Sequence, residues 1–422
     1  MRFYRILSII LLPLITIYML IRFFNGKESI ISLCNKFTIK YNSLYKGKTV
    51  IWFHAASVGE VYLAIPIIKM ILKVRDDLHI LITTTTITSA KIFQLSYIKN
   101  TTHQFLPLDV YYLVSRFLNY WNPKAAIFIE SEIWPNLVSE TTKRMPLFLL
   151  NARMSYSSFT IWKNYNSFIS SILQKYSLIF PASKLDYAQF SHFTTNNLKY
   201  YGHFKYSSPP LNYLPSCVQI LTMKLRNKNV FAAVSTHAEE EKLLIKVYKD
   251  LKKKIKNLFI IIVPRHPKRL KEIILILKNK NINFVTDIMH CNNKTELLIL
   301  GAFGILGNIF EVVEIVFVGG SFVNIGGHNI IEPAKQNCAI IVGPYTANFK
   351  DLITDFNDSQ AIVIVKNYQE FRDKLFHLFT DPEYKIRLIK NSTKLANKQP
   401  NILKKIVNII CKYINQDREK NC

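Results

Sequence analysis

The segment from His54 to Glu60, with the sequence HAASVGE, contains the residue types that a general base needs. An apolar run, Thr49–Phe53, leads into small residues, and a carboxylate follows where helical spacing begins. Small residues let a substrate approach the backbone closely. Glu60 could take a proton from a hydroxyl group if burial raises its pKa. The alternative is a glutamate that only satisfies the dipole at the start of a helix.

A second group of carboxylates lies in Glu130–Asn136, with the sequence ESEIWPN, directly after the apolar run Ala125–Ile129. We expect Glu130 and Glu132, two residues apart on an extended segment, to face opposite ways, with only one of them facing a substrate. An ordinary loop cap is the alternative for this segment.

A basic segment, Pro264–Arg269 with the sequence PRHPKR, follows the apolar run Leu258–Val263. Arg265 and the two further cations at its end suit a phosphate or carboxylate group of a substrate. The two prolines hold the segment extended, which orients Arg265. A solvated basic turn is the alternative.

Glycines cluster in the second half of the chain, where four of the 12 fall within nine residues. They belong to Gly319–Ser321 and Gly326–Pro333. Backbone N–H groups at such a helix start suit a phosphate, and Glu332 could accept hydrogen bonds from ribose hydroxyls. The cluster matches neither the Walker pattern nor GxGxxG. Upstream, Thr236 and Glu239 have the spacing of a capping box.

The elements that must position these residues are strands alternating with helices. This pattern predicts parallel sheets, in which ligands bind beyond the carboxyl ends of the strands. Prolines in 207–216 predict a linker between two α/β series. The expected strands are Thr49–Phe53, Leu78–Thr85, Ala125–Ile129, Pro146–Leu150 and Leu178–Phe180, then Val230–Val234, Leu258–Val263, Asn283–Thr286, Leu297–Leu300, Ile315–Val318 and Ala339–Val342.

The N-terminal segment Ile6–Ile21 carries no charge and is flanked by Arg5 and Arg22. We predict an uncleaved membrane-anchor helix, extended by flanking aromatic residues. A helix in the core of a soluble protein is the alternative, and the absence of a small-residue cleavage site disfavours a signal peptide. The basic residues expected on the cytoplasmic side are Arg22, Lys27, Lys36, Lys40, Lys46 and Lys48.

The composition is that of a folded and strongly basic protein of 422 residues, with 55 Lys and Arg against 28 Asp and Glu and a net charge of +27. The length suits two domains, and 49% hydrophobic residues exclude intrinsic disorder. Six cysteines without a CxxC pair indicate neither disulfides nor a zinc site, so no metal is expected. The charge favours a polyanionic partner, although lysine-rich composition alone could account for much of it.

Several of these motifs, in this order, resemble the Kdo (3-deoxy-D-manno-octulosonic acid) transferases of lipopolysaccharide and lipid A core biosynthesis. The resemblance runs from about Phe53 to about Lys350. It is carried by HAASVGE, the threonines Thr83–Thr86, FLPLD at 105–109, ESEIWPN, NARMS at 151–155, STHAEEE, PRHPKR and GGSFVNIGGHNIIEPA.

The resemblance implies a GT-B glycosyltransferase fold, an α/β class with two facing Rossmann-like domains and an N-terminal membrane anchor. The implied activity is inverting transfer of Kdo from CMP-Kdo to a phosphorylated lipid A precursor, lipid IVA, at the inner membrane without a metal or other cofactor. The expected domains are an anchor at 1–28, an acceptor-binding domain at 29–206, the linker at 207–216, a donor-binding domain at 217–400 and a basic amphipathic helix at 401–422.

The same resemblance assigns roles to individual residues. Glu60 would be the general base, and Glu130 and Lys205 would stabilise the transition state. Departures from the family pattern at Glu239, Ile330 and 301–303 put side-chain contacts to the donor in doubt there. The residues matching the CMP-Kdo site are Pro264, Arg265, Gly304, Ile305, Leu306, Asn329, Ile330, Ile331 and Glu332.

Three other functions compete with this interpretation. A GT-B transferase could use a UDP-sugar and another membrane lipid. A membrane-tethered nucleic-acid-binding protein would explain the charge, but it needs basic and aromatic residues interleaved on one face, which the sequence does not suggest. A catalytically inactive scaffold is disfavoured by Glu60, Glu130 and Arg265. We therefore expect no nucleic-acid partner.

Overall fold

Two compact units make up the computed structural model, which describes residues 2–41, 48–207, 210–302, 304–398 and 402–419. Unit 1 contains Met1–Phe204 and Asn401–Cys422, and unit 2 contains Lys205–Pro400. The expected linker at 207–216 therefore belongs to unit 2, although 208–209 lie outside the described residues. The separate terminal helix expected at 401–422 is instead part of unit 1.

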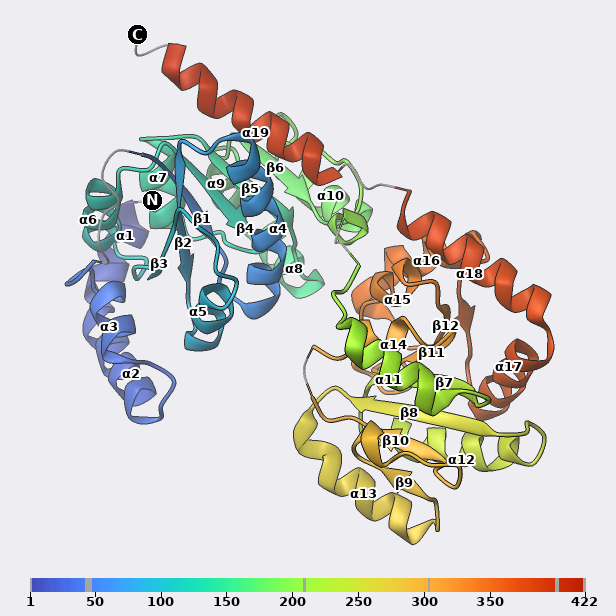
Figure 1. Ribbon diagram of the computed structural model, residues 1–422. Helices are drawn as coiled ribbons and strands as arrows, with labels where there is room; N and C mark the ends of the chain where they lie inside the picture. Colours follow the sequence, from blue (N-terminus) through green and yellow to red (C-terminus); the bar gives the residue numbers. More distant parts are fainter. Residues whose placement is uncertain (1, 42–47, 208–209, 303, 399–401, 420–422) are drawn as a thin grey trace. The chain divides into compact units, whose positions relative to one another are not determined.

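Unit 1 is built on a six-stranded parallel sheet with the order β3-β2-β1-β4-β5-β6 (Figure 1). The five strands expected from the sequence are confirmed. β3 escapes prediction because its sequence, TTHQF, is mostly polar and its first three residues are only half-buried. The strands are β1 (Thr49–His54), β2 (Leu78–Thr84), β3 (Thr101–Phe105), β4 (Ala125–Ile129), β5 (Leu147–Ala152) and β6 (Leu178–Pro181).

Helices connect these strands and cover the sheet. They are α1 (Arg2–Ile10), α2 (Leu12–Phe24), α3 (Ile30–Lys36), α4 (Val58–Val74), α5 (Ile87–Gln94), α6 (Tyr111–Trp121), α7 (Pro135–Thr142), α8 (Tyr156–Asn164), α9 (Asn166–Leu173), α10 (Lys184–Ser191) and α19 (Ile402–Glu419). A 3-10 helix, η1 (Phe204–Ser207), follows at the boundary between the units.

Unit 2 is built on a seven-stranded parallel sheet with the order β13-β12-β11-β7-β8-β10-β9. All six expected strands are present, and only the two-residue β13 is missing from the expectation. The strands are β7 (Asn229–Thr236), β8 (Leu258–Pro264), β9 (Phe284–Val285), β10 (Leu297–Ile299), β11 (Ile315–Val318), β12 (Ala339–Val342) and β13 (Val363–Ile364).

The helices of unit 2 alternate with its strands. They are α11 (Pro215–Leu225), α12 (Glu240–Lys252), α13 (Leu270–Asn279), α14 (Leu306–Phe310), α15 (Ile331–Lys335), α16 (Lys350–Asp358), α17 (Tyr368–Thr380) and α18 (Pro382–Ala396), with 3-10 helices η2 (Pro267–Arg269), η3 (Ile288–His290) and η4 (Ala347–Phe349). The predicted α/β class with two parallel sheets is therefore confirmed.

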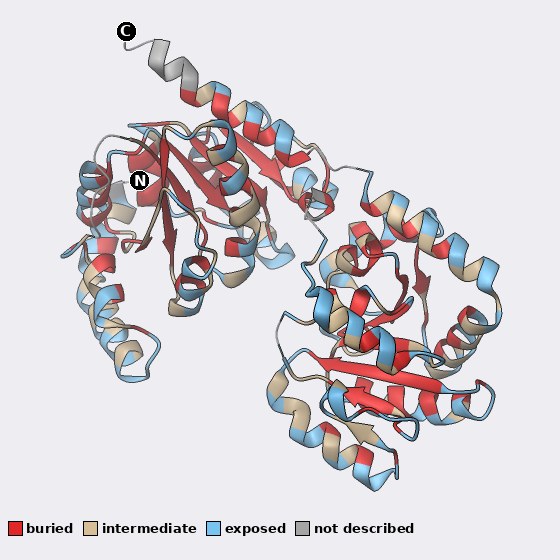
Figure 2. Ribbon diagram, in the orientation of Figure 1, coloured by how far each residue is buried: buried red, intermediate tan, exposed pale blue. Residues whose placement is uncertain are grey.

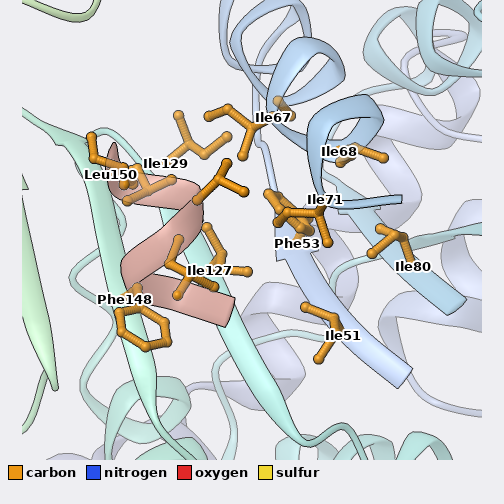
Figure 3. Packing of buried hydrophobic residues seen from close by; sticks show 14 of the residues in the cluster. Ile51, Phe53, Ile67, Ile68, Ile71, Ile80, Ile127, Ile129, Phe148 and Leu150 are labelled. Atoms are coloured by element: carbon orange, nitrogen blue, oxygen red, sulfur yellow. The ribbon is translucent and has the colours of Figure 1, made fainter. Parts of the chain in front are cut away.

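The central strands of each unit are buried on both faces, whereas most helices are buried along part of their surface only (Figure 2). In unit 1, α4 and α19 pack on the same apolar layer. Figure 3 shows Ile68 and Ile71 of α4 beside Phe53, and the pale red α19 against Ile127 and Phe148. A helix from the end of the chain therefore completes the core of the N-terminal unit.

The apolar N-terminal segment forms two helices rather than one. Among the described residues no single helix is both long and apolar enough to cross a bilayer, and only α1 and α2 together, bent by 50°, meet that test. Polar contacts attach α1 to the body of unit 1: Tyr4 donates to Asp109 at 2.9 Å, and Arg5 pairs with Glu140 of α7.

Candidate functional site

The topology of unit 1 brings Glu60 and the ESEIWPN segment together. The chain runs outward from β1 through β2 to β3 and then returns to β4 on the other side of β1. Such a switch point leaves a crevice beyond the carboxyl ends of the two central strands, where α/β proteins bind ligands. Glu60 follows β1 and Glu130 follows β4.

Glu60 is a buried carboxylate at this switch point, with 6% of its surface exposed. Ser57 caps α4 by accepting a hydrogen bond from the Glu60 N–H at 3.3 Å, and the Ala56 N–H donates to Glu60 Oε2 at 2.7 Å. Burial raises the pKa of Glu60 above its ordinary value, and the charges of Glu132 and Glu130 raise this pKa further. The hydrogen bonds from Ser57 and Ala56 act in the opposite direction without reversing the shift.

Glu132 is a fixed anion beside Glu60. Its Oε2 lies 3.0 Å from His54 Nε2 and accepts from Trp134 Nε1 at 2.6 Å. The other ring nitrogen of His54 lies 2.9 Å from Thr83 Oγ1 at the end of β2. Burial alone would raise the pKa of Glu132, but His54 and Trp134 together hold this pKa below its ordinary value. The sequence did not single out this His54–Glu132 pair, although each residue ends or follows a strand.

Glu130 is half-exposed and makes different contacts. Its Oε1 accepts from Asn151 Nδ2 at 3.1 Å and lies 3.8 Å from Arg153 Nε. The backbone of Glu130 has a φ of +69°, in the left-handed region, so the expected regular extended segment is wrong. Both Glu130 and Glu132 lie close enough to act on the pKa of Glu60. In a regular extended segment, side chains two residues apart would point to the same side, so the argument for opposite directions does not hold. The expectation that only one of them faces a substrate stays a prediction.

Lys205 lies in η1, but its side chain is outside the described residues. Its assignment as a second group that stabilises the transition state stays a prediction.

The sheet of unit 2 has its own switch point between β7 and β11, and the expected donor residues lie at or after the ends of β8, β10 and β11. Glu240, which is 1% exposed, occupies the centre of this region. Its Oε2 accepts from the N–H groups of His237 and Gly320 at 2.9 and 2.8 Å, and its Oε1 accepts from Ser321 and Phe322 at 3.0 and 2.9 Å. Burial raises the pKa of Glu240, against the effect of these four donors.

The contacts of Glu240 and its neighbours therefore show that two expectations from the sequence are wrong. The N–H groups of Gly320 and Ser321 were expected to bind phosphate, but they bind this internal carboxylate. The capping box between Thr236 and Glu239 does not form, because α12 starts only at Glu240, with Glu239 in the N-cap position. Thr236 Oγ1 instead donates to Glu241 Oε1 at 3.1 Å. The buried carboxylate of Glu240 thus holds the glycine-rich loop in place through hydrogen bonds to its backbone.

Pro264 and Arg265 end β8 as expected. Pro264 is buried, and Arg265 is exposed while its backbone N–H donates to Thr236 O at 3.0 Å. Arg269 is occupied differently, since its Nη2 lies 3.1 Å from the fully buried Glu241 and its Nη1 lies 2.8 Å from Glu272. Of these two arginines, Arg265 is therefore the better placed for a ligand.

The remaining predicted donor residues fall into two groups. Ile330 and Ile331 are 0% and 1% exposed and belong to the core, so only their backbone could contact a ligand. Asn329 Oδ1 accepts from the Ile331 N–H at 3.1 Å and caps α15 locally. Half-buried or exposed positions are found for Gly304, Ile305, Leu306 and Glu332.

Two histidines missed by the sequence analysis lie in the same region. His237 Nε2 and His328 Nε2 are 2.8 Å apart, and the ring of His266 lies 5.7 Å from that of His237. Burial and the nearby His266, Arg265 and Arg269 lower the pKa of His237. Within the described parts of the chain, no group of three or more His, Cys, Asp or Glu side chains is arranged to hold a metal ion.

Comparison with known proteins relates this chain to one family of transferases. A family model described as 3-deoxy-D-manno-octulosonic-acid transferase (kdotransferase) matches residues 33–208. A 3-deoxy-D-manno-octulosonic acid transferase of Rickettsia bellii (strain RML369-C) is 34% identical, over 98% of this chain and 99% of its own length. The transferase of the same name from Rickettsia felis (strain ATCC VR-1525 / URRWXCal2) is 32% identical, over 98% of this chain and 100% of its own.

Solved structures support the fold. The crystal structure of a glycosyltransferase from Rickettsia africae ESF-5 matches with a TM-score of 0.59 at 14% identity, covering 88% of this chain and 99% of that one. The similarity supports the expected GT-B-like fold with two α/β domains.

Proposed function

Because the chain belongs to the family of 3-deoxy-D-manno-octulosonic acid (Kdo) transferases, we propose that it transfers Kdo from CMP-Kdo to a phosphorylated lipid A precursor, lipid IVA, in lipopolysaccharide biosynthesis. Unit 1 binds the acceptor in this proposal, and unit 2 binds the donor. The observation that carries the proposal is the buried Glu60 at the switch point of unit 1, with two further carboxylates beside it.

Glu60 acts as the general base in this reaction. It takes the proton of the acceptor hydroxyl as the hydroxyl oxygen attacks the anomeric carbon of Kdo. The bond from that carbon to the phosphate oxygen breaks, and CMP leaves with the bonding electrons, so the configuration is inverted. The raised pKa of Glu60 makes it a stronger base than an exposed glutamate, which supports this role. Glu130 and Lys205 are assigned to the developing charges of the transition state.

The donor site uses the carboxyl edge of the sheet in unit 2. The exposed Arg265 binds the phosphate or carboxylate of CMP-Kdo, since a guanidinium fits either group with paired hydrogen bonds. The backbone around Gly304 and Asn329, with Glu332, binds the nucleoside. The N–H groups held by Glu240 shape this site without binding the phosphate themselves.

We further propose that residues 1–28 attach the enzyme to the cytoplasmic face of the inner membrane. The outer face of α2 supports this assignment, because Leu14, Ile17 and Phe24 are 63%, 55% and 83% exposed. Such a surface is stabilised by contact with lipid. Of the basic residues assigned to the cytoplasmic side, Lys27 and Lys40 are exposed, whereas Lys36 is buried against Glu28. Lys46 lies outside the described residues.

The reaction is tested by incubating the purified protein with CMP-Kdo and a tetra-acylated lipid A precursor and weighing the lipid product. We expect a mass increase by whole Kdo units, with the same yield in the presence of a metal chelator. Transfer from a UDP-sugar in place of CMP-Kdo would overturn the donor assignment, and loss of product on chelation would overturn the metal-free mechanism.

A further inference from the structure

A pocket of about 560 Å³ lies inside unit 1, between the N-terminal helices and the body of the unit. This volume falls within the range of roughly 300–1,000 Å³ that is typical of small-molecule sites. Residues of α1 and α2 form one wall, and residues 106–110, after β3, form part of another. The pocket therefore exists only because the N-terminal helices are docked on the body.

The helical wall presents a continuous stripe toward the pocket. Its apolar members are Leu7, Leu11, Ile15 and Met19, spaced by four residues. This spacing keeps side chains on one face of a helix, and here the face continues across the break between α1 and α2. Ile17 of α2 does not line the pocket and is 55% exposed on another face. The N-terminal segment thus has two apolar faces, of which one turns inward.

The pocket also reaches the loop that holds the proposed base. Ala56 and Glu132 both line it. The N–H of Ala56 donates to Glu60 Oε2, and the charge of Glu132 acts on Glu60. A ligand with its chain among the apolar residues can therefore place its head group near Glu60.

A charged group lines the same pocket. The carboxylate of Glu28 accepts from Arg22 Nε at 2.9 Å and from Lys36 Nζ at 2.8 Å, which leaves one net positive charge. Lys36 Nζ also donates to Thr85 O at 3.1 Å, and Thr85 Oγ1 donates to Ala56 O at 2.8 Å. This chain of contacts ties α2 and α3 to the loop of the base. The carboxylates of Asp109 and Glu132 also line the pocket, so the positive charge belongs to the Arg22–Glu28–Lys36 group alone, and a phosphate of the head group would bind there.

We propose that this pocket binds one acyl chain of the acceptor lipid and thereby places the acceptor hydroxyl at Glu60. The inference rests on the proposed function and adds a site for the lipid part of the acceptor. The docked helices then serve as a wall of the substrate site in addition to any contact with the membrane.

The test compares two tryptophan substitutions on one helix in the full-length protein. Ile15→Trp fills the pocket, and Ile17→Trp adds the same side chain to the outer face as the matched control. Each variant is assayed in detergent with the tetra-acylated precursor and with the same phosphorylated disaccharide after complete deacylation. We expect the ratio of kcat/KM between the two acceptors to fall about tenfold in Ile15→Trp, comparable to losing roughly two buried methylene groups. The ratio should stay at the wild-type value in Ile17→Trp.

A folding defect would lower kcat/KM for both acceptors together, so the ratio between the acceptors is insensitive to it. Met19→Trp is a second variant that fills the pocket. Equal ratios in all variants would overturn the proposal. Displacement of a fluorescent acyl probe from the pocket distinguishes the acceptor lipid from ordinary phospholipid. If phospholipid displaced the probe as effectively as the acylated acceptor does, the proposal would also be overturned. If the wild-type protein transfers Kdo to neither acceptor, the proposed function fails. The pocket is then supported or overturned by whether Ile15→Trp, and not Ile17→Trp, weakens probe binding.

Discussion

Glu60 combines burial with a carboxylate that the proposed reaction needs in its ionised form. The folded protein stabilises the ionised form less well than water does, and this raises the pKa of the group. A base made stronger in this way also costs the protein stability, because the same charge is better solvated in the unfolded chain. Activity and stability therefore conflict at this one residue.

Replacing Glu60 by Gln should remove activity and stabilise the fold at neutral pH. We expect kcat to fall by about 10²–10⁴-fold, the usual contribution of a general base. A raised folded pKa means that the ionised group destabilises the protein only above the ordinary glutamate pKa of about 4.3. Glu60→Gln should therefore have a higher Tm than the wild type at pH 8, and the difference should vanish toward pH 4. Exposed Glu383→Gln on α18 is the control, and near-normal turnover by Glu60→Gln would refute the base assignment.

Glu130 should influence the pH at which the enzyme gains activity. Its charge raises the pKa of Glu60, so Glu130→Gln lowers that pKa. The acidic limb of the kcat/KM profile should move to lower pH, in addition to any loss of rate. A profile with the limb at its wild-type position would show that Glu130 does not act on Glu60 through its charge.

Among the elements, the glycine-rich loop after β11 depends on one side chain of a helix. Glu240 binds the loop from the first turn of α12, and Gly320 adopts a φ of +66° that a residue with a Cβ rarely tolerates. The four N–H groups would be unsatisfied without this carboxylate, since they lie around a buried atom pair.

Glu240→Gln should loosen this loop. An amide turns one N–H₂ group toward backbone donors, so at least one pairing is lost, at a cost of about 1–3 kcal/mol in the stability of unit 2. CMP-Kdo binding, measured by calorimetry, should weaken as well. The neighbouring Glu239→Gln is the matched control, because Glu239 is exposed and pairs only with Lys242 among the contacts described. Equal affinities in the two variants would contradict an organising role for Glu240.

The sequence predicts elements better than the contacts between them. Most of the eleven expected strands are runs of apolar residues, such as Ala125–Ile129, and these residue types predict that the strands are buried. The site residue Glu60 is predictable from a motif at a strand end. Three of the four donors to Glu240 are not, because they come from a segment about 80 residues away in the chain. The packing of α19 on unit 1 is also not predictable from the sequence, because the pattern of an amphipathic helix does not indicate which surface covers its apolar face.

α19 should contribute to the stability of unit 1 rather than unit 2. Ile410 of this helix is fully buried in the core of unit 1, so Ile410→Ala should cost about 2–5 kcal/mol. Hydrogen exchange should then accelerate in β1 and β4 and stay unchanged in β7 and β11. The exposed Lys405→Ala is the control on the same helix. Faster exchange in unit 2 would contradict the assignment of α19 to unit 1.

The whole molecule carries a net charge of +27, and part of this charge is committed within the fold. Arg22 and Lys36 are neutralised in part by Glu28, and Arg269 is held by Glu241. Lys27, three residues after α2, and Lys40, after α3, remain exposed. We expect the protein to bind anionic membranes through both charge and apolar surface.

Binding to anionic vesicles should therefore be only partly sensitive to salt. Cosedimentation should fall between about 0.1 M and about 1 M salt, as the Debye length shrinks from about 10 Å to about 3 Å, and a salt-resistant fraction should remain. Lys27→Glu with Lys40→Glu should reduce the salt-sensitive part. Lys390→Glu with Lys394→Glu on α18 makes the same change in net charge within unit 2 and is the control. Equal loss in both double variants would mean that binding follows total charge alone.

The packing of α19 on unit 1 has a consequence for biosynthesis. The residues of unit 2 are continuous in the chain, whereas the core of unit 1 requires Ile406 and Ile410, which are translated after all of unit 2. The domain that begins first on the ribosome is therefore completed last. Until translation reaches α19, the nascent sheet of unit 1 keeps an apolar surface uncovered, a state in which such surfaces attract chaperones.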